Sequence, residues 1–467
     1  MTEQGIPTLG QSAWRRFCQL AVKIFYRRFE VAGADRLPAK GPVLVCANHV
    51  NALVDGVVLQ AACERPLHPL ARSGLFRTPI FRPILKILQA VPVYRRRDTE
   101  EPGTSSAAER TARNVDSFQR CYDYFGGGRA LMIFPEGQSH SDPRLRSLKT
   151  GAARLALGSR AANGELPAIV PVGLTFTHKG RFRSNVLVQF GDPVELEEVA
   201  DEPENATVRR LTERIGEGLE KVTLNTDSWE DLALIKLLQD FFTLRRQRGA
   251  RDSLSERFRS FQRLIEAHRL LRMTHPDQVE ILRRKLHLFS RLRERFGVRD
   301  YQLHLRYRPV QVLLFLLRSL FFALVIFPLA LWGFSNSALP YFATRRASLL
   351  AARGRDQYDT AGMLFGLLFF LLFWGGQSAA VWWYYGLWPT AAYMASLPIT
   401  AALALLIGHQ RRRIVEEVRV FLLFLRKKEV RSYLQTKRQE LEEDLAQMTR
   451  LARRELADNP QLRLRRT

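Results

Sequence analysis

Between residues 36 and 200 the hydrophobic positions alternate between short continuous apolar runs and longer stretches with helical spacing. The first run, Val43 to Ala47, follows a Gly41-Pro42 turn signal and predicts a buried strand over 43–48. Further strands are predicted at 130–134, 168–176 and 186–190, and helices at 54–64, 79–89, 105–125 and 148–160, the third ending at Gly126-Gly127-Gly128. This alternation predicts an α/β domain with a mostly parallel sheet.

The segment before this domain, residues 1–35, is predicted to hold one amphipathic helix over 12–29. Cations flank an apolar stripe there, formed by Trp14, Phe17, Ala21, Ile24 and Phe25. Such a helix either lies in a lipid interface or packs its stripe on the next domain, and the pattern supports both interpretations equally. Residues 1–11 lack the apolar core of a signal peptide, so secretion is not expected.

Charged helical stretches dominate residues 201–305, which we interpret as a helical accessory region. One of them carries an apolar stripe formed by Phe258, Phe261, Leu264, Ile265 and Leu271. Residues 411–467 are predicted to form a basic C-terminal helix, and both a membrane-surface helix and a self-associating helix fit its charge pattern.

Residues 306–410 are predicted to be a membrane region. The stretch 310–343 has 34 residues with Arg318 as its only charge, and 361–408 has 48 residues without Asp, Glu, Lys or Arg. As single helices they would be about 51 and 72 Å long, against a bilayer core of about 30 Å. The second stretch therefore predicts two spans that turn near 386–389, with Trp382, Trp383, Tyr384, Tyr385 and Trp388 as an interfacial belt.

Basic residues flank both apolar stretches and predict the topology. They are Arg306 and Arg308, then Arg345, Arg346, Arg353 and Arg355, then Arg411, Arg412 and Arg413. Positive charge favours the cytoplasmic side, so each stretch returns to its starting side and 310–343 is predicted to be a re-entrant or bent hairpin. The interpretation is a multi-pass membrane protein whose 36–200 domain faces the cytoplasm.

Overall charge and cysteine usage narrow the class of protein. Lysine and arginine exceed aspartate and glutamate by 71 minus 46, or 25, which calls for an anionic partner. The adjoining apolar stretches favour a phospholipid membrane over nucleic acid as that partner. Cys18, Cys46, Cys63 and Cys121 show no paired spacing, so neither a metal site nor a disulfide framework is expected and the thiols are predicted to be reduced and partly buried.

Candidate chemistry collects where predicted strands end, because the carboxyl ends of parallel strands share one edge of the sheet. His49 follows the first strand, and Asp55 lies six residues on, where its carboxylate can orient the imidazole as a general base. Pro135-Glu136-Gly137 follows another strand. Arg95 and Lys149 are cations suited to an anion, Lys149 at a predicted helix start. The alternatives are a structural histidine, a solvated basic face at Arg95 and an ordinary exposed lysine.

Other common catalytic signatures are missing from the sequence. It contains no G-x-S-x-G elbow, no Walker-type glycine loop and no dinucleotide fingerprint. No covalent intermediate, metal or bound cofactor is therefore expected.

The order NHVNALVD, VPVYR, IFPEGQSHSDPRLRSLKTGAAR and IVPVGLTF resembles the four sequence blocks of the glycerolipid acyltransferases. The resemblance covers residues 40–195. It implies that His49 is the catalytic base and Asp55 its partner, that Arg95, Glu136 and Gly137 help to hold a phosphate-bearing acceptor, and that Pro171 lies near the acyl donor. The family's commoner pattern has four residues between His and Asp, whereas five intervene here, as in a branch that resembles glycerol-3-phosphate or dihydroxyacetone-phosphate acyltransferases.

The function that follows is a membrane-bound O-acyltransferase. It would move a fatty acyl group from an acyl-CoA or acyl carrier protein thioester to glycerol 3-phosphate or dihydroxyacetone phosphate. The alternatives are a lysophosphatidate acyltransferase and, in another class, a noncatalytic membrane lipid-binding protein.

Overall fold

The computed structural model describes residues 7–94, 107–196, 203–246, 253–303, 309–352, 354 and 356–458. The chain divides into two compact units. The sheet unit comprises Met1–Asn225 and Ser348–Leu364, and the helical unit comprises Thr226–Ala347 and Phe365–Thr467. The segment Ser348–Leu364 thus belongs to the sheet unit, although it lies in the part of the sequence predicted to be membrane region.

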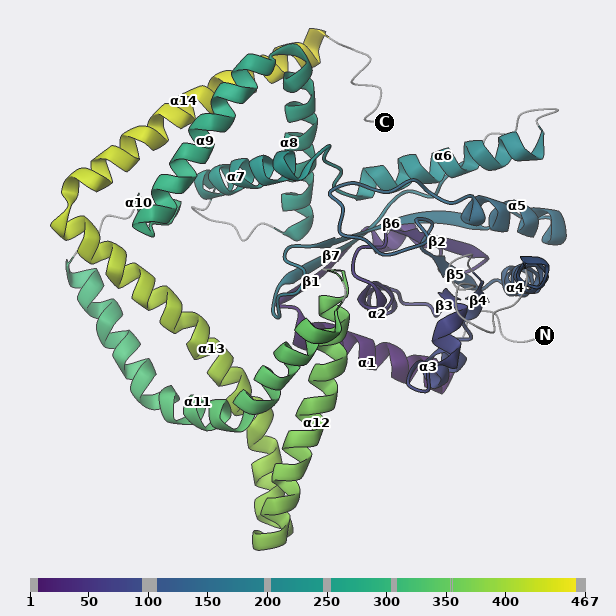
Figure 1. Ribbon diagram of the computed structural model, residues 1–467, viewed down its shortest axis with the longest axis horizontal. Helices are drawn as coiled ribbons and strands as arrows, with labels where there is room; N and C mark the ends of the chain where they lie inside the picture. Colours follow the sequence, from purple (N-terminus) through teal and green to yellow (C-terminus); the bar gives the residue numbers. More distant parts are fainter. Residues whose placement is uncertain are drawn as a thin grey trace. The chain divides into compact units, whose positions relative to one another are not determined.

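The sheet unit is built on one seven-stranded sheet with the order β1-β7-β6-β2-β5-β3-β4 (Figure 1). Its strands are β1 (Arg28–Ala32), β2 (Val43–Ala47), β3 (Leu67–Arg72), β4 (Val91–Val93), β5 (Ala130–Ile133), β6 (Ala168–Phe176) and β7 (Asn185–Phe190). Every pair is parallel except β6 and β7, which run antiparallel. The predicted α/β class with a mostly parallel sheet is confirmed.

Helices cover both faces of this sheet, which explains the continuous apolar run in β2. Val43, Val45 and Ala47 face a core shared with α1 and α2, whereas Leu44 and Cys46 face a core shared with α4, α5 and α6. The helices of this unit are α1 (Leu9–Phe25), α2 (Leu53–Ala62), α3 (Phe81–Ile87), α4 (Ala107–Gly126), α5 (Gly151–Asn163) and α6 (Glu204–Val222), with short 3₁₀ turns η1 (Ala34–Arg36) and η2 (Ser73–Arg77).

Three local features differ from the sequence prediction. The pattern does not predict β1 or β3, because β1 carries charges at the edge of the sheet and β3 contains Pro69, which usually argues against a strand. Helix α5 begins at Gly151, so Lys149 precedes it. Helix α6 buries Leu211 and Ile215 in the sheet unit, which therefore extends beyond the boundary predicted at residue 200.

Helix α1 packs one side on the sheet unit and leaves another apolar side open. Cys18 and Val22 are fully buried, and the Gln19 side chain donates to the carbonyl of Ala61 in α2. The opposite side is exposed and carries Leu9, Phe17, Leu20 and Ile24. The helix therefore packs on the sheet unit mainly through Cys18 and Val22, whereas Phe17 and Ile24 of the predicted stripe are exposed, and contact of the exposed side with lipid stays a prediction.

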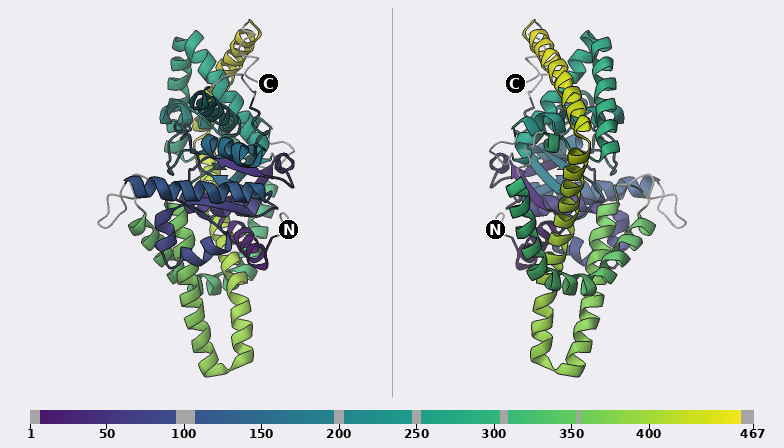
Figure 2. Two further views of the ribbon diagram at one scale, coloured as in Figure 1. Left: turned by 90° about the vertical axis from the view of Figure 1, so that its right-hand side faces the viewer. Right: turned by 90° about the vertical axis from the view of Figure 1, so that its left-hand side faces the viewer.

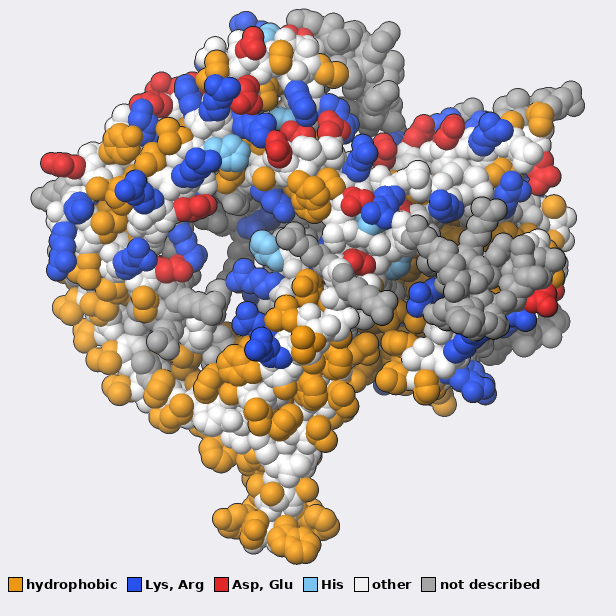
Figure 3. Space-filling model, viewed as in Figure 1, with side chains coloured by type: hydrophobic (Ala, Val, Ile, Leu, Met, Phe, Trp, Pro, Cys, Tyr) orange, Lys and Arg blue, Asp and Glu red, His pale blue; other side chains and the backbone are white. Residues whose placement is uncertain are grey.

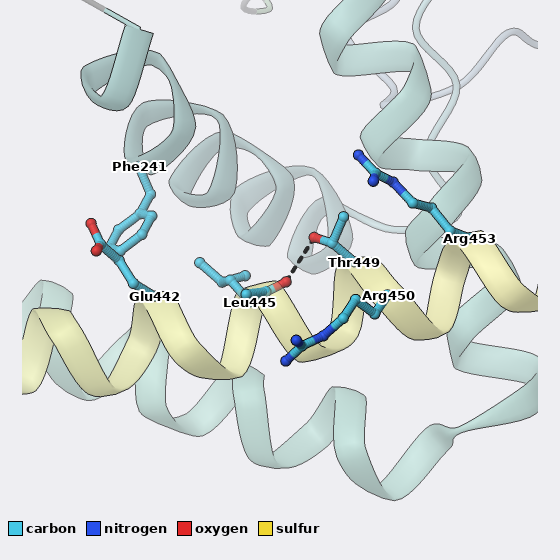
Figure 4. Close-up of a pocket in the computed structure, with 7 residues that line it drawn as sticks. Phe241, Glu442, Leu445, Thr449, Arg450 and Arg453 are labelled. Carbon is cyan, nitrogen blue, oxygen red and sulfur yellow. Dashed lines mark hydrogen bonds between the residues drawn. The ribbon is translucent and has the colours of Figure 1, made fainter.

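The helical unit contains α7 (Trp229–Arg246), α8 (Leu254–Thr274), α9 (Pro276–Phe296), α10 (Asp300–Leu303) and α14 (Lys428–Asp458). The predicted helical character of this region is confirmed. Leu441 and Leu445 of α14 are buried in one core with Leu271 and Leu286 of α8 and α9. The apolar side of α14 is therefore covered by its own chain, which corrects the expectation of a membrane-surface or self-associating helix. A small pocket between α7 and α14 holds none of the predicted site residues (Figure 4).

Three helices complete the chain: α11 (Pro309–Ala351), α12 (Tyr358–Tyr385) and α13 (Leu387–Arg426). The stretches Leu324–Ala351, Tyr358–Tyr385 and Leu387–Gly408 are long and apolar enough to cross a bilayer, which marks the chain as a membrane protein. Helices α12 and α13 form the predicted hairpin, which turns at Gly386 with a φ of 79° (Figure 2). Hydrophobic side chains gather at its tip (Figure 3).

Helix α11 differs from the predicted hairpin. It runs without a reversing turn through the stretch 310–343 and contains Pro328 and Pro340. Figure 1 shows it bent along its length. Proline lacks the N–H that an α-helix interior uses, so it bends the helix without ending it. The predicted re-entrant or bent hairpin is therefore wrong, and the stretch is one bent helix.

Candidate active site

Strand β2 holds the residue before His49 firmly on the sheet. The Asn48 side chain donates from Nδ2 to the carbonyl of Leu174 at 3.2 Å and accepts the Leu174 N–H on Oδ1 at 2.7 Å. The Asn48 N–H also donates to the carbonyl of Val172 at 3.4 Å. Because both partners lie in the neighbouring strand β6, His49 leaves a rigid edge of the sheet, as its position after an apolar run predicted.

His49 and Asp55 form a hydrogen-bonded pair. Nδ1 of His49 lies 2.9 Å from Oδ2 of Asp55, which also accepts the backbone N–H groups of Val50 and Asn51, each at 2.8 Å. Asp55 lies in the first turn of α2 and is fully buried. The Asp55 carboxylate accepts the Nδ1 proton of His49, which leaves the Nε2 lone pair free to take a proton.

The imidazole is fixed from a second side by an aromatic ring. Phe134 stacks on His49 with ring centroids 4.2 Å apart and planes inclined by 16°. No residue in the described part of the chain bonds Nε2, and the His49 side chain keeps 16% of its surface exposed. The sequence predicted the pair, and its geometry is that of an oriented general base.

Glu136 sits beneath this pair and is almost fully buried. Its Oε1 accepts the backbone N–H of His49 at 2.7 Å, and its Oε2 accepts the N–H of Arg146 at 2.9 Å and bonds Nε2 of His140. Nδ1 of His140 accepts the N–H of Asp142 at 3.1 Å, so the His140 proton lies on Nε2 and points at Glu136. Glu136 thus joins its own loop, between β5 and α5, to the turn after β2, and the predicted contact with an acceptor stays a prediction.

Gly137 and Lys149 lie side by side. Gly137 adopts a φ of +76°, and a side chain there would also approach the Lys149 stem at 3.4 Å. The Lys149 N–H donates to the carbonyl of Pro135 at 2.8 Å, while its side chain is exposed. A cation therefore stands beside the turn that carries Glu136, and its contact with phosphate stays a prediction.

The other two predicted residues are placed as follows. Pro171 is buried in β6 opposite Cys46, and its carbonyl accepts the N–H of Gly191 at 2.8 Å. Its relation to the acyl donor stays a prediction. Arg95 lies outside the residues that the structure describes.

Several residues of the site were not predicted. Asn51, Tyr26 and Asp359 are hydrogen-bonded together beside the His49–Asp55 pair, and the Lys179 amine donates to the carbonyl of His140 at 3.4 Å. Burial lowers the pKa of Lys179, and nearby carboxylates including Asp55 act in the opposite direction. Only His140 could have been found from the local sequence, because it follows Glu136 by four residues. The others are far apart in sequence.

The thiol closest in sequence to His49 is not suited to covalent chemistry. Cys46 is fully buried in β2, and burial raises its pKa to about 12, so the nucleophilic thiolate is disfavoured. All four cysteines are free, and they are buried almost completely, whereas the sequence predicted partly buried thiols. Within the described ranges, no three His, Cys, Asp or Glu side chains come together as metal ligands.

The mostly parallel sheet presents His49, oriented by Asp55, where β2 ends. A family model described as Acyltransferase matches residues 28–175. The matched residues include three of the four sequence blocks that resemble the glycerolipid acyltransferases and most of the fourth. The match includes His49, Asp55, Glu136 and Lys149.

Two yeast proteins named as acyltransferases match parts of the chain. The chain is 34% identical over 128 residues to glycerol-3-phosphate O-acyltransferase 2 of Saccharomyces cerevisiae, covering 26% of this chain and 17% of that protein. It is 24% identical over 302 residues to glycerol-3-phosphate O-acyltransferase 1 of the same yeast, covering 47% and 40%. The matches thus span less than half the length of either relative.

A solved structure gives a more distant likeness. The crystal structure of the 1-acyl-sn-glycerophosphate acyltransferase from Thermotoga maritima aligns with 45% of this chain and 79% of that one. The sequence identity is 17% and the TM-score is 0.33.

Proposed function

We propose that the chain is a membrane-bound O-acyltransferase that moves a fatty acyl group from an acyl thioester to glycerol 3-phosphate. The observation that carries this proposal is the 2.9 Å contact between His49 Nδ1 and Asp55 at the carboxyl edge of the sheet, with Nε2 left free. The yeast relatives named as glycerol-3-phosphate acyltransferases support this acceptor. Dihydroxyacetone phosphate is a second phosphorylated acceptor of the same size.

The residues suit a direct transfer without an acyl-enzyme. Nε2 of His49 takes the proton of the acceptor hydroxyl as its oxygen attacks the thioester carbonyl, and Asp55 stabilises the imidazolium that forms. The tetrahedral intermediate then expels the thiolate, which receives this proton from the imidazolium. Lys149, and Arg95 as the sequence indicated, would hold the acceptor's phosphate. The reaction as proposed needs no bound cofactor, since acyl-CoA or acyl carrier protein serves as co-substrate.

The membrane is the proposed place of this reaction. The exposed stripe of α1 lies in the same unit as His49, and a side chain at Gly362 in α12 would lie 3.6 Å from the Phe25 ring of α1. An exposed apolar helix side next to the start of an apolar helix favours docking of this unit on the bilayer surface. We place it on the cytoplasmic side of a multi-pass protein because of the basic flanks.

Two assays test the function. Purified full-length protein is given glycerol 3-phosphate, dihydroxyacetone phosphate or lysophosphatidate, each with acyl-CoA or acyl carrier protein thioester. We expect acyl transfer to glycerol 3-phosphate, and a 10²- to 10⁴-fold lower kcat in His49→Ala, typical of a lost general base. His287→Ala, in α9 of the helical unit, is the matched control and should retain activity.

The outcomes separate the candidate functions. Exclusive use of lysophosphatidate would favour the alternative function of a lysophosphatidate acyltransferase. Lipid binding that survives in His49→Ala, without turnover in either protein, would favour a noncatalytic lipid-binding protein. Lys149→Ala should chiefly raise the acceptor KM, because the phosphate is already charged in the ground state.

A further inference from the structure

The loop between His49 and Asp55 holds a strained backbone. Ala52 adopts a φ of 47° and a ψ of −128°, which is unfavourable for any residue with a Cβ atom. This loop is also one residue longer than the commoner spacing in the family that it resembles. Such a conformation persists only when its surroundings fix it.

One side of the loop is fixed by Asp55 itself. Its carboxylate accepts the N–H groups of Val50 and Asn51, and it accepts the His49 proton with the same oxygen. The position of the carboxylate under the imidazole and the position of this loop therefore depend on each other.

The other side of the loop is fixed by the first turn of α12, which contains Asp359 and Thr360. The Asn51 side chain donates from Nδ2 to Oδ2 of Asp359 at 2.6 Å, and the hydroxyl of Thr360 donates to the Asn51 carbonyl at 3.4 Å. Asn51 and Asp359 expose 0 and 1% of their surface. Asp359 and Thr360 belong to the sheet unit, as Asn51 does, so these contacts lie within that unit.

Asp359 is itself bound by two further parts of the sheet unit. Its Oδ1 accepts the N–H of Gly180, in the turn between β6 and β7, at 2.8 Å, and the Tyr26 hydroxyl after α1 donates to Oδ2 at 3.4 Å. In addition, the Ser139 hydroxyl donates to Asp356, which lies just before α12. Burying a carboxylate is unfavourable unless donors surround it, so this set of contacts forms as a whole.

We propose that Asp359 is a positioning residue for the His49–Asp55 pair. It acts through Asn51, whose side chain it binds and whose N–H donates to Asp55. The proposal rests on the proposed function. It means that the His49–Asp55 pair reaches its working geometry only when the first turn of α12 is packed against it. An apolar helix predicted to cross the membrane is then coupled to the catalytic base through one carboxylate.

The test uses full-length protein in Asp359→Ala, Asn51→Ala and the double variant. We expect a roughly 10- to 100-fold lower kcat in each single variant, the loss that a buried charge-assisted hydrogen bond corresponds to, with an unchanged acceptor KM. The double variant should be no slower than the singles, because both remove the same contact. Asp300→Ala, which removes a carboxylate that is 2% exposed and bonded to Arg438 in the helical unit, is the control and should keep its kcat.

A conservative variant separates hydrogen bonding from packing. Oδ1 of Asn51 has no partner in the described part of the chain, so in Asp359→Asn the Asn51 amide can turn and accept the new N–H. We expect Asp359→Asn to regain most of the kcat that Asp359→Ala loses.

Three results would overturn the proposal. They are a normal kcat in folded Asp359→Ala, an equal loss of kcat in Asp300→Ala, and additive losses in the double variant. If Asp359→Ala does not fold, Asn51→Ala decides by the same criteria. An active His49→Ala variant would contradict the proposed function. If His49→Ala is inactive and Asp359→Ala has a normal kcat, only the positioning role of Asp359 is contradicted.

Discussion

Oε1 of Glu136 accepts the backbone N–H of His49 at 2.7 Å. Glu136 follows β5 and His49 follows β2, and these strands are paired in parallel. The contact therefore ties together the turns that leave two neighbouring strands. The sequence indicated Glu136 and His49 as separate candidates, and the structure joins them by a hydrogen bond.

Glu136→Gln should weaken this connection. An amide oxygen cannot replace a carboxylate toward three donors, so we expect the free energy of unfolding to fall by about 1–3 kcal/mol and kcat to fall with it. Thermal unfolding in detergent and initial rates measure the two effects. Glu165→Gln, at an exposed position after α5, is the matched control and should change neither. A Glu136→Gln protein with normal stability would contradict the scaffolding role.

Asp55→Asn should impair turnover while leaving acceptor binding intact. The N–H groups of Val50 and Asn51 hold an acceptor oxygen at the Oδ2 position, so the asparagine carbonyl can still accept the Nδ1 proton, but a neutral amide stabilises the imidazolium far less than a carboxylate does. We expect a 10²- to 10⁴-fold lower kcat. Steady-state kinetics measure it, with Asp192→Asn, an exposed partner of Arg36, as the control. A raised KM with an unchanged kcat would show that Asp55 serves the acceptor instead.

His68 should make the protein less stable in mild acid. It is buried in β3, and burial lowers its pKa from 6.5 to about 4. Between these values the unfolded chain binds the proton more readily than the folded one, so stability falls as pH falls from 6.5 to 4, by roughly 3 kcal/mol in total.

The variant for this effect is His68→Asn. Nδ1 of His68 lies 2.9 Å from the carbonyl of Leu88, and an asparagine amide still offers a donor there without taking up a proton. Unfolding midpoints measured from pH 7 to pH 4.5 should decline less steeply in His68→Asn than in the parent protein. Parallel curves would show that His68 does not titrate on unfolding.

Single cysteines at Leu349 and Val415 test the topology. Both positions are exposed, and the four native cysteines are buried with pKa values raised to about 12 by burial, so they should react little. With both basic flanks on the cytoplasmic side, neither Leu349→Cys nor Val415→Cys should be labelled from outside intact cells, and both should be labelled after permeabilisation. Labelling of only one from outside would mean an odd number of crossings between them.

The sequence by itself determined what depends on local pattern. A continuous apolar run fixed β2 because a strand covered on both faces needs apolar residues at every position, and the helix-length apolar stretches fixed the membrane character. The contact between His49 and Asp55 was also predictable from local sequence, because Asp55 follows His49 by six residues and lies in the first turn of α2.

Only the tertiary structure decided which distant groups complete the site. Asp359 bonds Asn51 across 308 residues. Asn51 lies in the block NHVNALVD, but Asp359 lies in none of the four blocks, so no local pattern predicts that they meet. The strand β3 was hidden by Pro69, and the apolar side of α14 gave no sign that α8 and α9 would cover it. A side chain's partner across the fold depends on packing of the whole unit, because burial leaves a polar group only those donors that the surrounding elements bring to it.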